Sequence, residues 1–258
     1  MLKRTLKVRL YPTGKQKRAL KELQIRCAKL WNRANYLIRQ EFFKNGKIFS
    51  YETVYNLVKN SPEYKALPTD VSQAVLKKLS ETWKSFKELK KLEKENKLPK
   101  HIKKVSPPKY FKDLKKNQTL PMPVIPIIAP RSYSLGDFTF SFAIPKDFKQ
   151  NYRIKKRLEI LATYRIPYEV ALRRNKLRFA KLYQSYKLKR AEILSKNGRW
   201  YVHISVELPR TEINKSKGIN YASIDLGIRN LITLAVYSSQ LPTIKMVGLT
   251  LGRHLRIR

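Results

Sequence analysis

The chain has 258 residues, of which 57 are lysine or arginine and 18 are aspartate or glutamate, so its formal net charge at pH 7 is +39. Apolar residues make up 42% of the chain, which is enough for packed cores and excludes a disordered protein. So large a positive charge repels itself unless a polyanion neutralises it, and nucleic acid is the polyanion whose counterions lysine and arginine release. The basic residues are spread along the whole sequence, which argues against an amphipathic membrane-binding face.

Cysteine and histidine are scarce. Cys27 is the single cysteine, which excludes an intramolecular disulfide and a multi-cysteine zinc site within this sequence, and its helical spacing favours a core position. The three histidines lie far apart and lack the spacing of metal ligands. No apolar stretch reaches about 18 residues, and the first 12 residues lack the apolar core of a signal peptide. We therefore expect a cytoplasmic protein without a membrane partner.

The beginning of the sequence predicts a strand followed by a long helix. Residues 2–11, LKRTLKVRLY, alternate between apolar and mostly basic side chains, which is typical of a half-buried strand with a basic outer face. Pro12 ends this strand, and Thr13 is suited to cap the helix that follows. From about residue 15 to residue 44, the apolar residues repeat with helical spacing until an Asn-Gly pair closes the segment.

Further helices are predicted over residues 52–58 and from about residue 70 to residue 89. Their apolar stripes are typical of the core of a helical bundle, which leaves the opposite, basic faces for function. Residues 94–120 are rich in lysine and interrupted by proline, which predicts a loop or a poorly ordered basic segment.

Strand patterns return in the second half of the sequence. An Asn-Gly turn at residues 195–198 lies between two alternating runs and strongly indicates a hairpin. The first strand of the chain lies far along the sequence from these later strands. It either stands apart from them or joins their sheet, in which case the helices are an insertion. The predicted strands cover residues 132–135, 139–144, 178–188, 186–194 and 199–208.

An acidic residue interrupts the apolar run YASIDLGIRNLITLAV at residues 221–236. The run reads as a strand, a tight turn at Gly227 and a second strand, with Asp225 at the end of the first; a third strand is expected at 243–249. Burying a carboxylate is costly unless it has a partner. Two uses stay open on the residues alone: Asp225 binds a divalent metal with other carboxylates, or it caps the backbone of its own turn.

Three stretches of the chain resemble TnpB proteins, the insertion-sequence-encoded RNA-guided nucleases that are related to type V CRISPR effectors. They are KRTLKVRLYPTGKQKRALKEL with the following LWNRANYLIR, RWYVHISVEL at 199–208, and IDLGIRNLITL at 224–234, which is similar to the family's first RuvC motif. The resemblance implies an α+β fold. It divides the chain into a wedge-type β-barrel (residues 1–12 and 116–214), an inserted helical recognition-type domain with a basic loop (13–115), and the first strands of an incomplete RNase H-like, or RuvC, fold (219–258).

The resemblance also implies an activity, namely RNA-guided DNA cleavage in transposition, with guide-type RNA and target DNA as partners. Asp225 then corresponds to the first catalytic Mg²⁺-binding aspartate. The family's site needs a further glutamate and aspartate from later motifs, and a cysteine-rich zinc-binding insert accompanies it. No acidic residue follows Asp225 in this sequence. We therefore expect a C-terminally truncated chain with an incomplete Mg²⁺ site and no zinc site, inactive as a nuclease alone.

Three functions stay open: a nuclease completed by a second chain, a nucleic-acid-binding module, and a non-functional insertion-sequence remnant. The binding module is favoured because tyrosines lie among basic residues in 181–201, where rings can stack on unpaired bases, although Trp200 is expected in the barrel core. The residues expected to contact phosphates are Arg4, Lys7, Arg9, Lys15, Lys187, Lys189 and Arg199.

Overall fold

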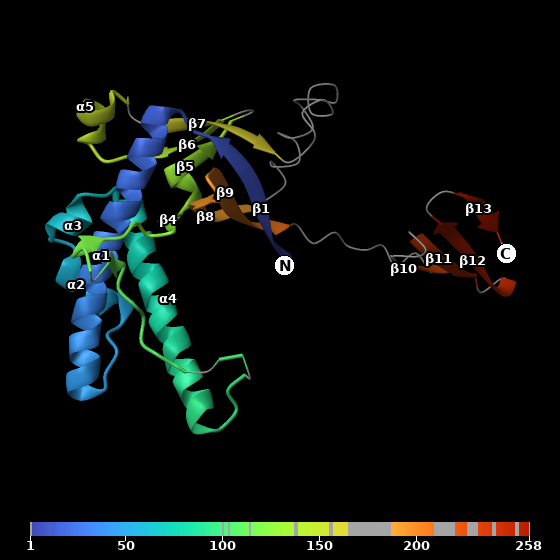
Figure 1. The fold of residues 1–258 in the computed structure, drawn as a ribbon, viewed down its shortest axis with the longest axis horizontal. Helices are drawn as coiled ribbons and strands as arrows, with labels where there is room; N and C mark the ends of the chain where they lie inside the picture. Colours follow the sequence, from blue (N-terminus) through green and yellow to red (C-terminus); the bar gives the residue numbers. More distant parts are fainter. Residues whose placement is uncertain are drawn as a thin grey trace. The chain divides into compact units, whose positions relative to one another are not determined.

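The structure, a computed structural model, divides into two compact units, Met1–Arg210 and Thr211–Arg258, and each is considered by itself (Figure 1). The first contains every helix described below and a large antiparallel sheet; the second contains a smaller sheet. Together they confirm the predicted mixture of helices and antiparallel strands. The structure describes residues 2–99, 101–102, 104–113, 115–136, 139–154, 157–164, 187–208, 220–225, 232–238, 241–250 and 253–257.

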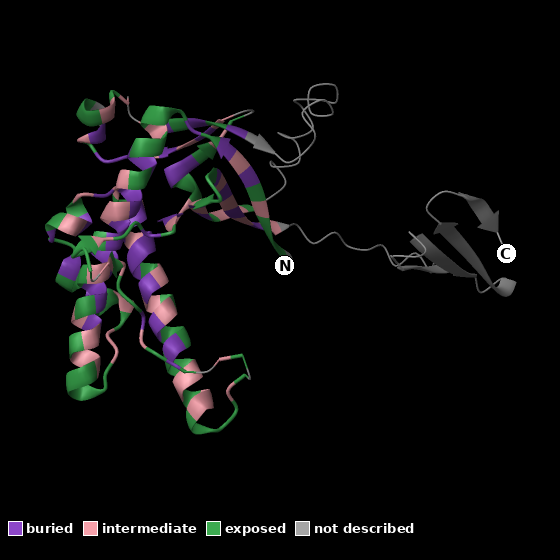
Figure 2. Cartoon of the chain, viewed as in Figure 1, coloured by how far each residue is buried: buried purple, intermediate pink, exposed green. Residues whose placement is uncertain are grey.

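The helical part begins with α1 (Gly14–Asn45). Thr13 and Gln16 form a capping box at its start, and Gly46 ends it with a φ of 68° in the left-handed region that glycine tolerates. Three further helices follow it along the chain: α2 (Tyr51–Val58), α3 (Pro62–Lys65) and α4 (Thr69–Lys94). Buried positions repeat along the facing sides of α1 and α4, so the apolar stripes are bundle core, as predicted (Figure 2). None of the helices in the described part of the chain is long and apolar enough to cross a membrane.

The large sheet has seven strands in the order β4-β8-β9-β1-β7-β6-β5. The first strand therefore joins the later strands, which is one of the two arrangements that the sequence left open. It lies in the middle of the sheet, with Lys7 opposite His203 of β9 and Leu10 opposite Ala162 of β7. The strands are β1 (Leu2–Tyr11), β4 (Val124–Ile127), β5 (Tyr133–Leu135), β6 (Thr139–Ala143), β7 (Arg157–Tyr164), β8 (Lys187–Lys196) and β9 (Arg199–Leu208).

The predicted hairpin is confirmed as β8 and β9. Asn197 and Gly198 have φ angles of 50° and 71°, as expected for a two-residue turn that matches the twist of the strands. The part of the predicted strand that covers 178–186 lies outside the described residues, and β8 begins at Lys187. Strand β7 was not predicted from the sequence.

The large sheet is curled, so that edge strand β5 lies near β8 in the other half of the sheet. Tyr133 of edge strand β5 donates a hydrogen bond from its hydroxyl to the carbonyl of Lys189 in β8, at 2.8 Å. The concave side holds a core that includes Phe140, Phe142 and Trp200, and Trp200 is 4% exposed, as predicted. This curvature is compatible with a barrel, and the wedge-type assignment stays a prediction.

The segment predicted as a loop or a poorly ordered basic segment is a loop where it meets α1, and side chains of α1 fix it there over residues 108–111. Asn32 exchanges two hydrogen bonds with the backbone of Phe111, and the buried Asn35 donates one to the carbonyl of Pro108. These amide side chains satisfy backbone groups in place of a neighbouring strand. The remaining short elements are β2 (Lys112–Asp113), β3 (Gln118–Thr119), the 3₁₀ helix η1 (Pro130–Ser132) and α5 (Phe148–Tyr152).

Cys27 lies fully buried in α1, as its spacing predicted. Burial raises the pKa of its thiol far above the ordinary value, because the thiolate is excluded from water. We therefore expect no labelling of the folded chain by Ellman's reagent, and one thiol per chain after unfolding. The absorbance of the released thionitrobenzoate measures this. Labelling of the native chain at the rate of a free thiol would contradict the packing of α1.

The second unit is a four-stranded antiparallel meander. Its first two strands are the ones predicted around the acidic motif, and Asp225 ends the first, paired with Thr233 of the second. A third strand covers the predicted residues 243–249, and a fourth was not predicted. The assignment of this unit to an RNase H-like fold stays a prediction. The strands are β10 (Asn220–Asp225), β11 (Ile232–Ser238), β12 (Leu241–Thr250) and β13 (Arg253–Ile257).

Candidate nucleic-acid interface

The outer side of β1 and β9 presents basic and aromatic side chains. Along β1, Val8 and Leu10 are buried, and the alternate residues point away from that core. The register with β9 places Lys7 beside His203 and Arg9 beside Tyr201. We call this surface the basic sheet face, and it comprises Lys3, Lys7, Arg9, Tyr11, Tyr201 and His203.

Two cations of the basic sheet face lie over aromatic rings. The Lys7 ammonium nitrogen is 4.6 Å from the centre of the Tyr201 ring, and the Arg9 guanidinium carbon is 4.7 Å from that of Tyr11. Such contacts hold a cation in place while leaving its charge uncompensated. Within the part of the chain that the structure describes, neither cation forms an ion pair with a carboxylate. Both charges are therefore available to an anionic ligand.

His203 lies at the centre of this face. Its strand neighbours are Lys7 on β1 and Glu192 on β8. Partial burial lowers the pKa of the imidazole below its ordinary value, the charge of Lys7 lowers it further, and the carboxylate of Glu192 opposes both. His203 is therefore neutral at pH 7. Its Nε2 atom is buried and has no hydrogen-bond partner among the residues described.

The lowered pKa of His203 makes stability depend on pH. The unfolded chain takes up the proton first as the pH falls through about 6.5, the unperturbed value, so the free energy of unfolding should decrease below that pH. Replacing His203 by glutamine should flatten this decrease. Urea titrations followed by circular dichroism between pH 7 and pH 5 measure it, with His101→Gln, at an exposed position, as the control. An unchanged pH profile in His203→Gln would contradict the assignment.

The structure unites some of the predicted phosphate contacts and separates others. Lys7 and Arg9 share the basic sheet face. Arg4 is exposed, but the alternation of β1 puts it on the opposite side, with Leu6. Lys189 is 3.2 Å from Glu207, so its charge is partly neutralised. The remaining three lie exposed at element ends: Lys15 in the first turn of α1, Lys187 at the start of β8 and Arg199 at the start of β9.

His203 and Tyr11 were missed as site residues, whereas Tyr201 was among the rings that the sequence suggested for stacking on bases. The signal was present in RWYVHISVEL, where the strict alternation around Trp200 places Tyr201 and His203 on one outer face. The position of that face beside β1 depends on pairing between strands about 200 residues apart, which sequence alone left open. Of the other rings singled out in the sequence, Tyr183 and Tyr186 lie outside the described residues.

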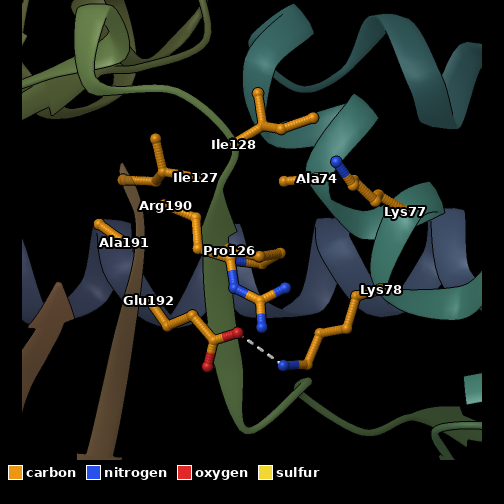
Figure 3. Close-up of a pocket in the computed structure, with 9 residues that line it drawn as sticks. All are labelled: Ala74, Lys77, Lys78, Pro126, Ile127, Ile128, Arg190, Ala191 and Glu192. Atoms are coloured by element: carbon orange, nitrogen blue, oxygen red, sulfur yellow. Dashed lines mark hydrogen bonds and ion pairs between the residues drawn. The ribbon is translucent and has the colours of Figure 1, made fainter. Parts of the chain in front are cut away.

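One polar seam joins α4 to the large sheet, and a second joins α1 to the segment before α5. In the first, Lys78 and Glu192 form an ion pair at 2.7 Å beside a hollow that includes Pro126 (Figure 3). Arg190, which also lines this hollow, pairs with Glu81 of α4 at 3.0 Å. Lys78 and Arg190, two of the three cations that line this hollow beside Lys77, are neutralised in this way and tie α4 to the sheet. The second seam binds Arg26 of α1 to Glu22 and to Asp147, which precedes α5, and the arginine lowers the pKa of that aspartate.

The carboxylate of Asp225 lies outside the described side chains; only its place at the end of β10 is set. Among the residues described, no group of three or more histidine, cysteine, aspartate or glutamate side chains is placed to hold a metal ion. A Mg²⁺ site needs several oxygen ligands from different elements. The Mg²⁺ site, which the resemblance implies to be incomplete with Asp225 as its ligand, stays a prediction.

Comparison with known proteins finds two matches, one at the beginning of the chain and one over most of it. Residues 1–47 match the helix-turn-helix domain model of OrfB proteins of the IS605 type; in this structure those residues form strand β1 and the single helix α1. The chain is also 35% identical, over an alignment of 256 residues covering 91% of it, to TnpB-like protein ORF457 of Acidianus two-tailed virus. It spans about half of that relative, 49% of its length. Both matches support the resemblance to TnpB proteins that the sequence suggested.

Proposed function

We propose that this chain binds structured RNA and DNA through the basic sheet face, as the nucleic-acid platform of a TnpB-like protein that acts in transposition. The observation that carries the proposal is the pair of uncompensated cations, Lys7 and Arg9, stacked on tyrosine rings in the middle of the large sheet. A formal net charge of +39 supplies the long-range attraction.

The geometry of β1 suits a phosphate backbone. Residues two apart on a strand are separated by about 6.6 Å, so Lys3, Lys7 and Arg9 form a row about 20 Å long. Tyr11 extends this row on β1, and Tyr201 lies beside it on β9, opposite Arg9; such rings can stack on unpaired bases. Contacts of this kind fix register and orientation without reading sequence. Recognition of sequence is then left to base pairing with a guide RNA, as in RNA-guided nucleases.

Salt dependence tests this function. The full chain is titrated into a fluorescein-labelled structured RNA transcribed from its own locus, and into a DNA duplex, at increasing salt concentrations. We expect log Kobs to fall linearly with log salt for both ligands, because bound lysine and arginine release counterions. Absence of binding at low salt, or binding that salt does not weaken, would refute the proposal.

A second candidate function is the inherited one, RNA-guided DNA cleavage. The motif around Asp225 favours it, because that residue ends β10 next to a second antiparallel strand, where a carboxylate can be held rigidly. Mg²⁺-dependent cleavage of a target plasmid by the chain with its locus RNA is the test, beside Asp225→Ala. Cleavage that Asp225→Ala abolishes would establish the activity and its residue. Binding without cleavage would leave the chain a binding platform under these conditions.

A further inference from the structure

Helix α1 packs one side into the bundle core, and a stripe on its other side exposes aromatic residues to solvent. Tyr36 is 53% exposed and Phe43 is 63% exposed, and Arg39 lies between them at helical spacing. Exposed faces of bundle helices ordinarily carry polar residues, so large exposed rings gathered at one place indicate a binding surface.

A third ring completes this surface from a segment far along the sequence. Tyr110, which is 37% exposed, lies in the segment that Asn32 and Asn35 fix to α1. The Arg39 guanidinium carbon is 5.1 Å from the centre of the Tyr110 ring and 5.3 Å from that of Phe43. Arg39 also donates a hydrogen bond from Nη1 to the carbonyl of Pro108 at 2.9 Å, which holds it between the two rings.

The charge around these rings is positive. In the described part of the chain, Arg39 forms no ion pair, and Lys44, Lys109 and Lys112 are exposed within two residues of Phe43 or Tyr110. Planar rings, a planar guanidinium and flanking lysines are the combination that binds single-stranded nucleic acid, with bases on the rings and phosphates on the cations. An apolar protein partner would provide no opposite charge for these lysines.

We propose that Tyr36, Arg39, Phe43 and Tyr110, the aromatic platform, bind unpaired nucleobases of single-stranded RNA or DNA by stacking. This inference deepens the proposed function and rests on it. It divides the work between two surfaces: the basic sheet face contacts backbones of any form, and the aromatic platform selects strands whose bases are free.

The test compares single strands with a duplex of the same sequence and length. The full chain is titrated into RNA and DNA single strands carrying one 2-aminopurine, whose fluorescence is quenched by stacking, and into the labelled duplex. Phe43→Leu and Tyr110→Leu keep apolar bulk and remove the rings, and Arg39→Gln removes the guanidinium. The charge control is Arg18→Gln, at an exposed position about six turns earlier on α1.

We expect each ring variant to bind both single strands about tenfold more weakly and to lose 2-aminopurine quenching, with duplex affinity changed less than about twofold. Comparison of the RNA and DNA arms identifies the natural ligand. Equal losses on single strand and duplex, or wild-type affinity for both, would overturn the inference while leaving the basic sheet face intact. A changed oligomeric state with unchanged nucleic-acid affinity would also overturn it, in favour of a protein partner. Failure of the wild-type chain to bind any nucleic acid would refute the proposed function itself.

Discussion

Replacing Lys7 and Arg9 together by glutamine is expected to weaken binding of duplex DNA about 30-fold near physiological salt. Each lysine–phosphate or arginine–phosphate contact on B-form DNA contributes about 0.9 to the slope of log Kobs against log salt, so the loss of two contacts lowers that slope by about 1.8. Extrapolated from 1 M to about 0.15 M salt, the same two contacts account for about 1.5 log units of affinity. Anisotropy titrations at several salt concentrations measure both quantities.

The control removes the same charge elsewhere. Lys91 and Lys94 are exposed in the last turn of α4, at the end of that helix remote from the large sheet (Figure 1). The Lys91→Gln/Lys94→Gln variant should retain nearly the wild-type slope. If both double variants lose the same affinity, binding depends on net charge alone and the basic sheet face has no special role. Arg4→Gln is a second comparison, because it changes the same strand on the opposite side.

Replacing Asn35 by alanine is expected to lower the free energy of unfolding of the first unit by about 3 kcal/mol. Asn35 is fully buried, donates to the carbonyl of Pro108 and accepts from the indole N–H of Trp83 of α4, both at 2.9 Å. Its removal leaves the buried indole N–H without a partner, which costs about 1–3 kcal/mol, and opens a small cavity. Urea unfolding followed at the helical circular dichroism band measures the change, because the described helices all lie in this unit.

A double-mutant cycle isolates the hydrogen bond from the cavity. Trp83→Phe removes the indole N–H, so Asn35→Ala should cost less in that background by at least about 1 kcal/mol. Asn56→Ala, at an exposed position in α2, should change stability by less than about 0.5 kcal/mol. Purely additive effects of Asn35→Ala and Trp83→Phe would show that the contact contributes nothing to the stability.

Local patterns in the sequence were sufficient for the elements whose causes are local. The helix cap at Thr13, the long apolar stripe of α1 and the Asn-Gly turn before β9 each involve residues within a few positions of one another. Trp200 was predicted in the core from the alternation of its strand alone, and its 4% exposure confirms this. The outward position of Lys7 and Arg9 was predicted in the same way, from the alternation of β1.

Features that depend on distant residues were missed. The fixed conformation of residues 108–111 could not be predicted, because their backbone groups form hydrogen bonds with Asn32 and Asn35, about 75 residues earlier. No pattern within the segment indicates those hydrogen bonds. Tyr110 consequently gave no sign of its place beside Arg39. The lowered pKa of His203 likewise depends on burial within the folded sheet and on Lys7 of a distant strand, while Glu192 of a third strand opposes the shift.

Photo-crosslinking tests the central claim, binding through the basic sheet face, most directly. The full chain is bound to locus RNA containing 4-thiouridine, irradiated and digested, and the crosslinked peptides are identified by mass spectrometry. Crosslinks to the peptides of β1 and β9, at Tyr11 and Tyr201, that disappear in Lys7→Gln/Arg9→Gln are the predicted result. Crosslinks that leave both strands unmodified in the wild-type chain, while binding is saturated, would contradict the claim.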